Sequence, residues 1–489
     1  MHNQKIPIEK ELKLAVNLPK STKFHFIGLG GIGMSGLAKF LLELGFRVSG
    51  SDIADSKYAN ATTKLGGTVF IGHHPQNIGD ASIIIASSAI KTDNPEYVEA
   101  LNKNLPIYHR SQLLAALMEG LGLNEGVNQV SIGAAGTHGK TTTSGMASFA
   151  FEECEKTPSV VVGGIIPFMN TNAKYGNGNY FIAELDESDG TIEFYTPDYT
   201  IVTNLEHDHP DHYTDGLEQV ISTFECYTNK LKDGQKLILN VDCPGNLQLL
   251  NRIAKDKAIL YSIDEKSELH SKAKYRGTDI KLSGFNNTCK VYKNDEYLGE
   301  LKLTVPGIHN ISNALSVIAA AVENGLEFSE VTKALTKFTG MKRRFQILGE
   351  INGAKIIDDY AHHPTEIKAT LSAAKEITKT TKSGRVIAVF QPHRYSRLEN
   401  FWDEFVASFD DADVVYICDV YSAGEAPREN ISSENLVEHS NHPNIRYVSG
   451  SIERISNIVF VDLEENDLLI SMGAGNITKL GHLMMEKCF

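Results

Sequence analysis

Residues 135–142 read Ala-Gly-Thr-His-Gly-Lys-Thr-Thr, between an apolar run at 127–132 and a helix-forming stretch at 143–151. A strand that leads into a glycine loop and then a helix is the setting of a phosphate-binding loop. Glycines let backbone N–H groups approach phosphate oxygens, and the helix N-terminus adds a partial positive charge. The stretch therefore predicts a nucleoside triphosphate site, with Lys140 on the β- and γ-phosphates and the Thr141 hydroxyl on Mg²⁺.

One position departs from the strict motif G-x-x-x-x-G-K-[ST]. Its first glycine would stand where the chain has Ala134, and Gly133 comes one place early. A glycine-rich turn with a surface lysine is the alternative interpretation, and the strand–loop–helix context favours the phosphate site.

Composition restricts the class of protein. The chain has 489 residues, 42% of them hydrophobic and 22% charged, which is typical of a globular protein of about three domains. No run approaches the roughly 18 apolar residues of a membrane span, and the first twenty residues lack the apolar core of a secretory signal. A net charge of −14 argues against a nucleic-acid-binding surface. Six cysteines without C-x-x-C pairs indicate a reduced, cytoplasmic protein without a disulfide framework or zinc site.

A second glycine loop lies near the start of the chain. Gly28-x-Gly30-x-x-Gly33 follows an apolar strand and precedes a helical stretch, and Asp52 ends the next strand. This is a literal dinucleotide fingerprint, which alone would indicate NAD with Asp52 on a ribose hydroxyl. The same turn holds any diphosphate, including that of a UDP-sugar, and an unliganded tight turn is the third alternative. Two phosphate loops favour chemistry that joins a diphosphate-bearing substrate to a group activated by ATP.

Alternation of strands and helices predicts an α/β protein with parallel sheets in three domains. The predicted boundaries are a polar leader at 1–22 and domains at 23–123, 124–340 and 341–489, with a glycine-rich linker at 120–128. The first and third domains should be Rossmann-like, and the central one a P-loop ATPase type with an antiparallel subsection at 257–305. The predicted strands are 24–27, 46–52, 82–87, 180–184, 199–204, 236–240, 355–357, 385–390, 413–418 and 467–471.

Acidic and histidine side chains follow two strands of the central domain. Glu184 ends one strand and begins the sequence E-L-D-E-S-D-G, and N-L-E-H-D-H-P-D-H-Y at 204–213 follows another. Oxygen ligands at a strand end beside a phosphate loop are where Mg²⁺ is usually held. A solvated acidic loop is the alternative for either segment alone. Of the histidines in the second segment, His207 and His212 are expected to be bystanders.

Two further segments stand at predicted strand ends of the third domain. Residues 358–366 read D-D-Y-A-H-H-P-T-E, and residues 390–397 read F-Q-P-H-R-Y-S-R. Arg394 and Arg397, three apart after a proline turn, form a fork suited to a carboxylate or a phosphate. Surface arginines at a helix start are the alternative.

Taken together, these motifs resemble those of the Mur ligases of peptidoglycan synthesis, over nearly the whole chain. The resemblance rests on the segments quoted above and on F-I-G-L-G-G-I-G-M-S-G-L-A at 26–38, S-S-A-I-K-T-D-N-P-E at 87–96, H-N-I-S-N-A at 309–314 and G-A-G-N-I at 473–477. Two positions depart from the family pattern. Asn476 stands where the family has aspartate, and Phe224 lies where related ligases carry a carbamylated lysine, so no such lysine is predicted.

The resemblance assigns the site residues. It implies that the UDP-sugar is held by Gly30, Gly31, Gly33, Asp52, Ser87, Ser88, His109 and Arg110. It implies that ATP is held by Gly136, Thr137, His138, Gly139, Lys140, Thr141, Thr142, His309, Asn310, Asn313, Arg344 and Asp359, and metal by Thr141, Glu184 and His209. The residues it implies in catalysis and amino-acid recognition are Lys140, His209, His362, Arg394 and Arg397.

The implied reaction is the ATP-dependent joining of L-alanine to the lactyl carboxylate of UDP-N-acetylmuramate, through an acyl phosphate. ATP is then a substrate, with two Mg²⁺ or Mn²⁺ ions, and the other partners are small molecules, with no nucleic acid or membrane, in a cytoplasmic monomer or homodimer. Two rivals stay open: a recycling ligase that adds a preformed peptide, and an idle nucleotide-binding protein. The short path from 191 to 197 favours the alanine enzyme over the first rival. Intact Lys140, Thr141, Glu184 and His209 argue against the second.

Overall fold

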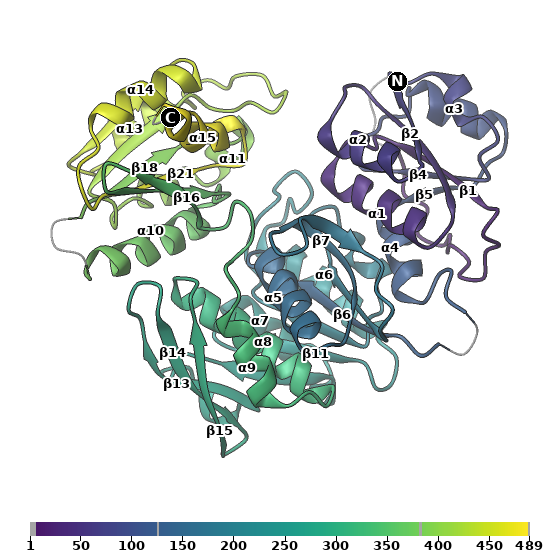
Figure 1. The fold of residues 1–489 in the computed structure, drawn as a ribbon, viewed down its shortest axis with the longest axis horizontal. Helices are drawn as coiled ribbons and strands as arrows, with labels where there is room; N and C mark the ends of the chain where they lie inside the picture. Colours follow the sequence, from purple (N-terminus) through teal and green to yellow (C-terminus); the bar gives the residue numbers. More distant parts are fainter. Residues whose placement is uncertain (1–5, 125–126, 381–383, 488–489) are drawn as a thin grey trace. The chain divides into compact units, whose positions relative to one another are not determined.

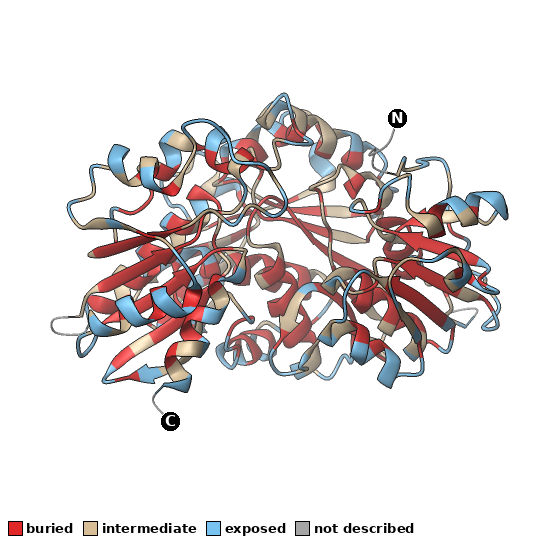
Figure 2. Ribbon diagram, turned by 90° about the horizontal axis from the view of Figure 1, so that it is seen from above, coloured by how far each residue is buried: buried red, intermediate tan, exposed pale blue. Residues whose placement is uncertain are grey.

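The computed structural model describes residues 6–124, 127–380 and 384–487. The chain forms two compact units: one comprises Met1–Tyr261, Ser267–Lys274 and Ser316–Val331, and the other comprises Ser262–Lys266, Tyr275–Leu315 and Thr332–Phe489. Each unit is a mixed α/β structure in which most strands are buried (Figures 1 and 2). The predicted α/β class is confirmed.

The N-terminal part of the first unit is a parallel sheet in the order β3-β2-β1-β4-β5. Its strands are β1 Lys23–Ile27, β2 Arg47–Asp52, β3 Thr68–Ile71, β4 Ile83–Ala86 and β5 Ile107–His109. Its helices are α1 Ile32–Glu43, α2 Lys57–Lys64, η1 Pro75–Ile78, α3 Pro95–Asn102 and α4 Arg110–Met118. The order reverses between β1 and β4, so the carboxyl ends of these strands form the crevice where open α/β sheets bind ligands.

The second sheet of this unit carries the phosphate loop, and its strand order here is β12-β11-β10-β6-β9-β7-β8. The strands are β6 Val130–Ala135, β7 Ser159–Ile166, β8 Thr171–Lys174, β9 Tyr180–Glu184, β10 Tyr199–Val202, β11 Lys236–Asn240 and β12 Ala258–Ser262. The helices are α5 Lys140–Glu153, η2 Thr191–Phe194, α6 Leu217–Asn229, α7 Pro244–Leu250, η3 Lys255–Lys257 and η4 His270–Lys272. Strand β6 lies centrally between β9 and β10, which brings the ends of all three strands together.

Helix α1 joins the two sheets of this unit. It packs against β7 and β8, and the Asn172 amide on β8 donates to the carbonyl of Ile32 at 2.7 Å. A Cβ on Gly36 of α1 would lie 2.5 Å from that amide, so this helix position needs glycine. The described part of the leader also packs here, since Leu14 is buried and Gln112 donates to the carbonyls of Glu9 and Leu12.

The second unit holds the antiparallel strands β13 Tyr275–Lys281, β14 Asn287–Lys293 and β15 Glu296–Leu303, as predicted for 257–305, whereas β12 in that range pairs parallel to β11. The division between the two units falls within helix α8, Ile308–Glu323, after Leu315, and within helix α9, Phe328–Thr336, after Val331. The other sheet has the order β16-β17-β21-β18-β19-β20 and is parallel except for β16.

That sheet's strands are β16 Gln346–Ile351, β17 Ala354–Asp359, β18 Val386–Phe390, β19 Val414–Cys418, β20 Ile445–Val448 and β21 Leu468–Met472. Its helices are α10 Pro364–Thr378, α11 Tyr395–Asn400, α12 Trp402–Val406, α13 Ser433–His439, α14 Ile452–Val461, η5 Asn476–Thr478 and α15 Lys479–Glu486. Apolar clusters cover both faces, as a Rossmann-like sheet requires. The sequence did not predict strands β3, β5, β7, β8, β16 and β20, all of which except β7 lie at the edge of a sheet.

Part of the predicted linker, residues 125–126, lies outside the described residues. Among the described residues, no helix combines the length and the apolar character needed to cross a membrane. Cys154, Cys226, Cys243, Cys289 and Cys418 are free thiols, and Cys488 lies outside the described residues.

Candidate active site

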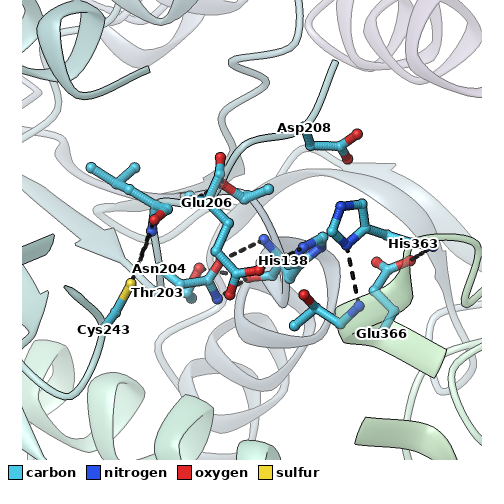
Figure 3. Close-up of polar contacts among 12 residues, drawn as sticks. His138, Thr203, Asn204, Glu206, Asp208, Cys243, His363 and Glu366 are labelled. Atoms are coloured by element: carbon cyan, nitrogen blue, oxygen red, sulfur yellow. Dashed lines mark hydrogen bonds and ion pairs between the residues drawn. The ribbon is translucent and has the colours of Figure 1, made fainter. Parts of the chain in front are cut away.

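The phosphate loop is held in shape by the segment that follows β10 (Figure 3). The Asn204 side chain accepts from the backbone N–H of His138 at 2.9 Å and donates to its carbonyl at 3.1 Å. The Thr203 hydroxyl donates to the same carbonyl at 2.6 Å. Gly136 has φ +117°, and a Cβ there would lie 2.4 Å from the Thr203 hydroxyl, so this glycine is required. The first residues of the 204–213 segment therefore support the loop, a role the sequence did not reveal.

Lys140 is the first residue of α5 and points back across the loop. Its ammonium group donates to the carbonyls of Gly136 at 2.7 Å and Thr137 at 2.9 Å, and to the Glu187 carboxylate at 2.9 Å. Burial, together with repulsion from Asp186, raises the pKa of Glu187 to about 7, although Lys140 lowers it. A lysine held at the mouth of a glycine loop is placed to contact phosphate oxygens.

The predicted metal ligands Thr141 and Glu184 are adjacent. The Thr141 hydroxyl donates to one Glu184 oxygen at 3.1 Å, and the backbone N–H of Gly163 donates to the other at 2.7 Å. A hydroxyl beside a fixed carboxylate is a donor set of the kind Mg²⁺ prefers. These residues therefore fit the ion that the sequence predicts.

His209, the third predicted ligand, has a left-handed backbone with φ 54°. Its Nε2 atom lies 3.6 Å from a carboxylate oxygen of the buried Asp208, and its backbone N–H donates to the other oxygen at 2.7 Å. A non-glycine residue in this conformation costs free energy, which is typical of a functional position.

In the first glycine loop, Gly30 is held by Asp52, whereas Gly31 and Gly33 have open space where a side chain would stand. The backbone N–H of Gly30 donates to the Asp52 carboxylate at 2.7 Å, so Asp52 holds the turn itself. A Cβ on Gly31 or Gly33 would meet nothing within 4 Å among the described residues. Gly31 has φ −74° and ψ 148°, which any residue adopts. The fold does not require glycine there, whereas close approach of a ligand would.

We expect Gly31→Val to fold normally and to bind the sugar nucleotide at least about ten-fold more weakly, because its side chain would enter the space above the turn. The stability cost should stay within about 1 kcal/mol, the usual effect of a poorer N-cap residue. Calorimetric titration with UDP-N-acetylmuramate, beside thermal unfolding of the same sample, measures both. Unchanged affinity would mean that no ligand approaches this turn.

Of the other predicted sugar-nucleotide residues, Ser88, His109 and Arg110 meet the loop that follows β9, whereas the carbonyl of Ser87 accepts from the backbone N–H of Ile90. Arg110 Nη2 donates to Asp186 at 2.6 Å, and the Ser88 hydroxyl donates to Asp189 at 2.5 Å. His109 Nε2 lies 3.0 Å from the Ser88 hydroxyl. Burial opposes ionisation of Asp186, yet the charge of Arg110 holds the pKa of this carboxyl well below its usual range. Burial opposes the charge of Arg110 too, and Asp186 raises the Arg110 pKa above its usual value.

The predicted adenine segment lies at the start of α8. Asn310 and Asn313 are buried and His309 is exposed. The Asn310 amide donates to the carbonyl of Pro306 at 2.7 Å and the Asn313 amide to the Asn310 side chain at 3.4 Å. The two amides therefore brace the first turn of the helix.

In the second unit, Arg344, Asp359 and His362 gather around Tyr360 and Glu366. The Arg344 guanidinium lies 5.1 Å from the centre of the Tyr360 ring and 3.5 Å from Glu366, which is also 3.1 Å from His362 Nδ1. Arg344, predicted for the nucleotide, and His362, predicted for the amino acid, thus contact the same carboxylate. Glu366 also completes the N-terminal capping box of α10 with His363, both labelled in Figure 3.

Asp359 accepts backbone N–H groups of Phe345 at 2.6 Å and Ala361 at 2.7 Å, which fixes the turn carrying Arg344. Burial raises the pKa of Asp359 to about 6, although Arg344 opposes the shift. A carboxyl whose folded pKa lies above the unfolded value of 3.8 favours the folded state in its protonated form. This contribution to the free energy of unfolding amounts to about 3 kcal/mol. It is fully present below about pH 4 and is lost as the pH rises through about 6.

We therefore expect Asp359→Asn, which does not titrate, to gain stability relative to the wild type as pH rises from 4 to 7. The measurement is the difference in unfolding free energy between the two proteins, by chemical denaturation, across that range. Asp403→Asn, at an exposed position on α12, is the matched control for the loss of one aspartate. A flat profile for Asp359→Asn would contradict the prediction.

The predicted arginine fork follows β18. Arg394, exposed, caps α11 with φ 66°, and Arg397 is buried within α11. The loop before them is held by Tyr421, whose ring stacks on His393 at 5.6 Å and whose carbonyl accepts from the Arg394 backbone. Asn476, which departs from the family pattern, accepts from the Gln391 amide at 2.8 Å in the adjacent loop. Phe224 is fully buried in α6.

The comparisons with known proteins identify the family. Three family models match in order along the chain: Mur ligase family, catalytic domain, at 23–121; Mur ligase middle domain at 134–321; and Mur ligase, glutamate ligase domain, at 343–475. The chain belongs to the Mur ligase family.

Individual members of the family are similar to this chain over nearly their whole length. The UDP-N-acetylmuramate–L-alanine ligase of Geobacter sp. strain M21 is 39% identical over 469 residues, covering 95% of this chain and 97% of the relative. That of Pelotomaculum thermopropionicum is 40% identical over 473 residues, covering 96% and 98%. The crystal structure of UDP-N-acetylmuramate-alanine ligase from Thermotoga maritima aligns with a TM-score of 0.78 at 29% identity, covering 95% and 99%. A murein peptide ligase from Psychrobacter arcticus, at 21% identity, TM-score 0.66 and coverage of 95% and 98%, shares the fold.

Proposed function

We propose that this protein is an ATP-dependent ligase that joins L-alanine to the lactyl carboxylate of UDP-N-acetylmuramate, in the synthesis of peptidoglycan precursors for the cell wall. One observation carries the proposal. The short stretch 184–189 contacts both Thr141 and Lys140 of the phosphate loop and Ser88 and Arg110 of the N-terminal sheet. Two anion sites connected by one loop suit transfer of a phosphoryl group from ATP to a carboxylate on the sugar nucleotide.

In this proposal each predicted domain binds one substrate: 23–123 binds the UDP-sugar, 124–340 binds ATP, and 341–489 binds the amino acid. A carboxylate does not react with an amine, and an acyl phosphate supplies the leaving group. Lys140 stabilises the charge that develops on the transferred group, and Arg394 and Arg397 hold the alanine carboxylate so that its amine faces the acyl carbon.

Thr141, Glu184 and His209 would hold Mg²⁺ or Mn²⁺, in two sites. When bound, the metal neutralises phosphate charge. His309, Asn310, Asn313, Arg344 and Asp359 are assigned to the nucleotide, and His362 to the amino acid. The protein would act in the cytoplasm on small molecules, as a monomer or homodimer.

The test is an assay of ADP release by the purified protein with UDP-N-acetylmuramate and a panel of L-alanine, L-serine, glycine and a cell-wall tripeptide. We expect ADP to form only when UDP-N-acetylmuramate is present, and fastest with L-alanine. Turnover with the tripeptide and none with alanine would support the recycling ligase instead. No turnover with any member of the panel would reject the ligase.

A further inference from the structure

The loop between β9 and η2 carries carboxylates that point in two directions. Glu184 and Glu187 contact the phosphate-loop residues Thr141 and Lys140. Asp186 and Asp189 instead contact residues of the N-terminal sheet and α4. The proposed function assigns Glu184 to the metal and gives neither aspartate a role in binding.

Each of these aspartates is fixed through one oxygen and contacts the N-terminal sheet region through the other. Asp186 Oδ1 accepts the backbone N–H of Ser188 at 2.9 Å, and its Oδ2 accepts from Arg110. Asp189 Oδ1 accepts from the hydroxyl of Thr191 at 2.6 Å, and its Oδ2 accepts from Ser88. Because the carboxylates are anchored within their own loop, they are rigid supports for the groups they contact.

Arg110 keeps donors available. Its side chain is 24% exposed, and only Nη2 contacts Asp186 and, at 3.7 Å, Asp189. In the described part of the chain, Nε and Nη1 have no hydrogen-bond partner. A planar guanidinium held at one nitrogen presents the others in a fixed orientation, so an anion that binds them need not order a flexible side chain.

His109 is fixed in the same way. Its Nδ1 lies 2.6 Å from the Ser111 hydroxyl, and its Nε2 lies 3.0 Å from Ser88 and 3.6 Å from Asp189. Burial lowers the pKa of His109 to about 4, although Asp189 opposes this, so the ring is neutral at pH 7. The Ser88–His109 pair is therefore a neutral hydrogen-bonding group whose geometry Asp189 sets.

We propose that Asp186 and Asp189 are positioning residues of the sugar-nucleotide site, which hold Arg110 and the Ser88–His109 pair in the orientation that binds the anionic substrate. The site is then composite, because the central sheet supplies the support and the N-terminal sheet region supplies the contacts. This role rests on the proposed binding of UDP-N-acetylmuramate.

The test measures the dissociation constants of UDP-N-acetylmuramate and of a non-hydrolysable ATP analogue for the full chain, by calorimetry. Asp186→Asn and Asp189→Asn should each weaken sugar-nucleotide binding about ten-fold, the usual effect of losing one charge-assisted hydrogen bond. Affinity for the ATP analogue should stay within about two-fold. Asp233→Asn, at an exposed turn of the same unit, controls for the loss of one negative charge.

A double-mutant cycle separates positioning from general destabilisation. If Asp186 acts through Arg110, Asp186→Asn should weaken binding in the wild type and add nothing in an Arg110→Ala background. Equal losses in both backgrounds would overturn the proposal. Unchanged binding by both aspartate variants would also overturn it, and tighter binding would mean that the carboxylates compete with the substrate. Failure of the wild-type chain to bind UDP-N-acetylmuramate would reject the proposed substrate and this role with it.

Discussion

Lys140→Ala is expected to reduce kcat by about 10²–10³, the usual effect of removing one preorganised donor to a developing charge. The dissociation constant for UDP-N-acetylmuramate should change by less than about two-fold, because the Lys140 ammonium group donates to the phosphate loop and to Glu187. Single-turnover measurement of ADP formation, beside calorimetric titration of the sugar nucleotide, separates the two quantities. A near-normal kcat would refute the assignment of the phosphate loop.

Two further variants make the result specific. Lys174→Ala removes a lysine of the same unit that pairs with Glu152 at 2.7 Å, and it should keep its activity. Lys140→Ala also leaves Glu187 buried without its cation. Because the pKa of Glu187 is already about 7, this carboxyl can become neutral at modest cost. Adding Glu187→Gln to Lys140→Ala should therefore change stability little, and it should not restore the rate.

The sequence predicted the central elements well because their signals are local. The glycine loop before α5 and the apolar runs of β9, β11 and β18 specify their structure within a few residues. The edge strands β8, β16 and β20 lack such runs, and they form strands because a neighbouring strand offers hydrogen bonds. The pairing partner decides that these segments are extended, and the residues of the segments alone do not show it.

In the site as well, local motifs could be predicted from the sequence, whereas contacts between distant residues could not. Lys140, Thr141 and Glu184 could be placed from a motif because each stands at a fixed position of a strand–loop–helix unit. The support given by Asn204 to the phosphate loop and by Asp186 to Arg110 joins residues 66 and 76 positions apart. Asp52 is instructive in another way: the fingerprint predicts a ribose contact, and the structure shows its carboxylate on the N–H of Gly30. Residue type indicated the chemistry in these cases, and only the fold indicated the partner.

Glu184→Gln should lower kcat by about 10²–10³ at ordinary Mg²⁺ concentrations, an effect comparable to the loss of Lys140. The substitution is informative because glutamine can keep both observed contacts. Its amide oxygen can accept from the Gly163 backbone, and its NH₂ group can donate to the Thr141 hydroxyl oxygen, in the places where the two carboxylate oxygens now lie. The loop geometry is then preserved and only the negative charge is lost.

The loss of a metal ligand changes the Mg²⁺ dependence of the rate, whereas a structural defect does not. If Glu184 helps to hold Mg²⁺, the metal concentration that gives half-maximal rate should rise by about ten-fold or more, and excess Mg²⁺ should recover part of the activity. Glu152→Gln removes a carboxylate of the same unit that pairs with Lys174, so it is the matched control and should leave the metal dependence unchanged. If Glu184→Gln keeps a normal kcat and metal dependence, the carboxylate serves only to tie Thr141 to Gly163. In that case the metal must be held by other oxygen ligands at this edge of the sheet.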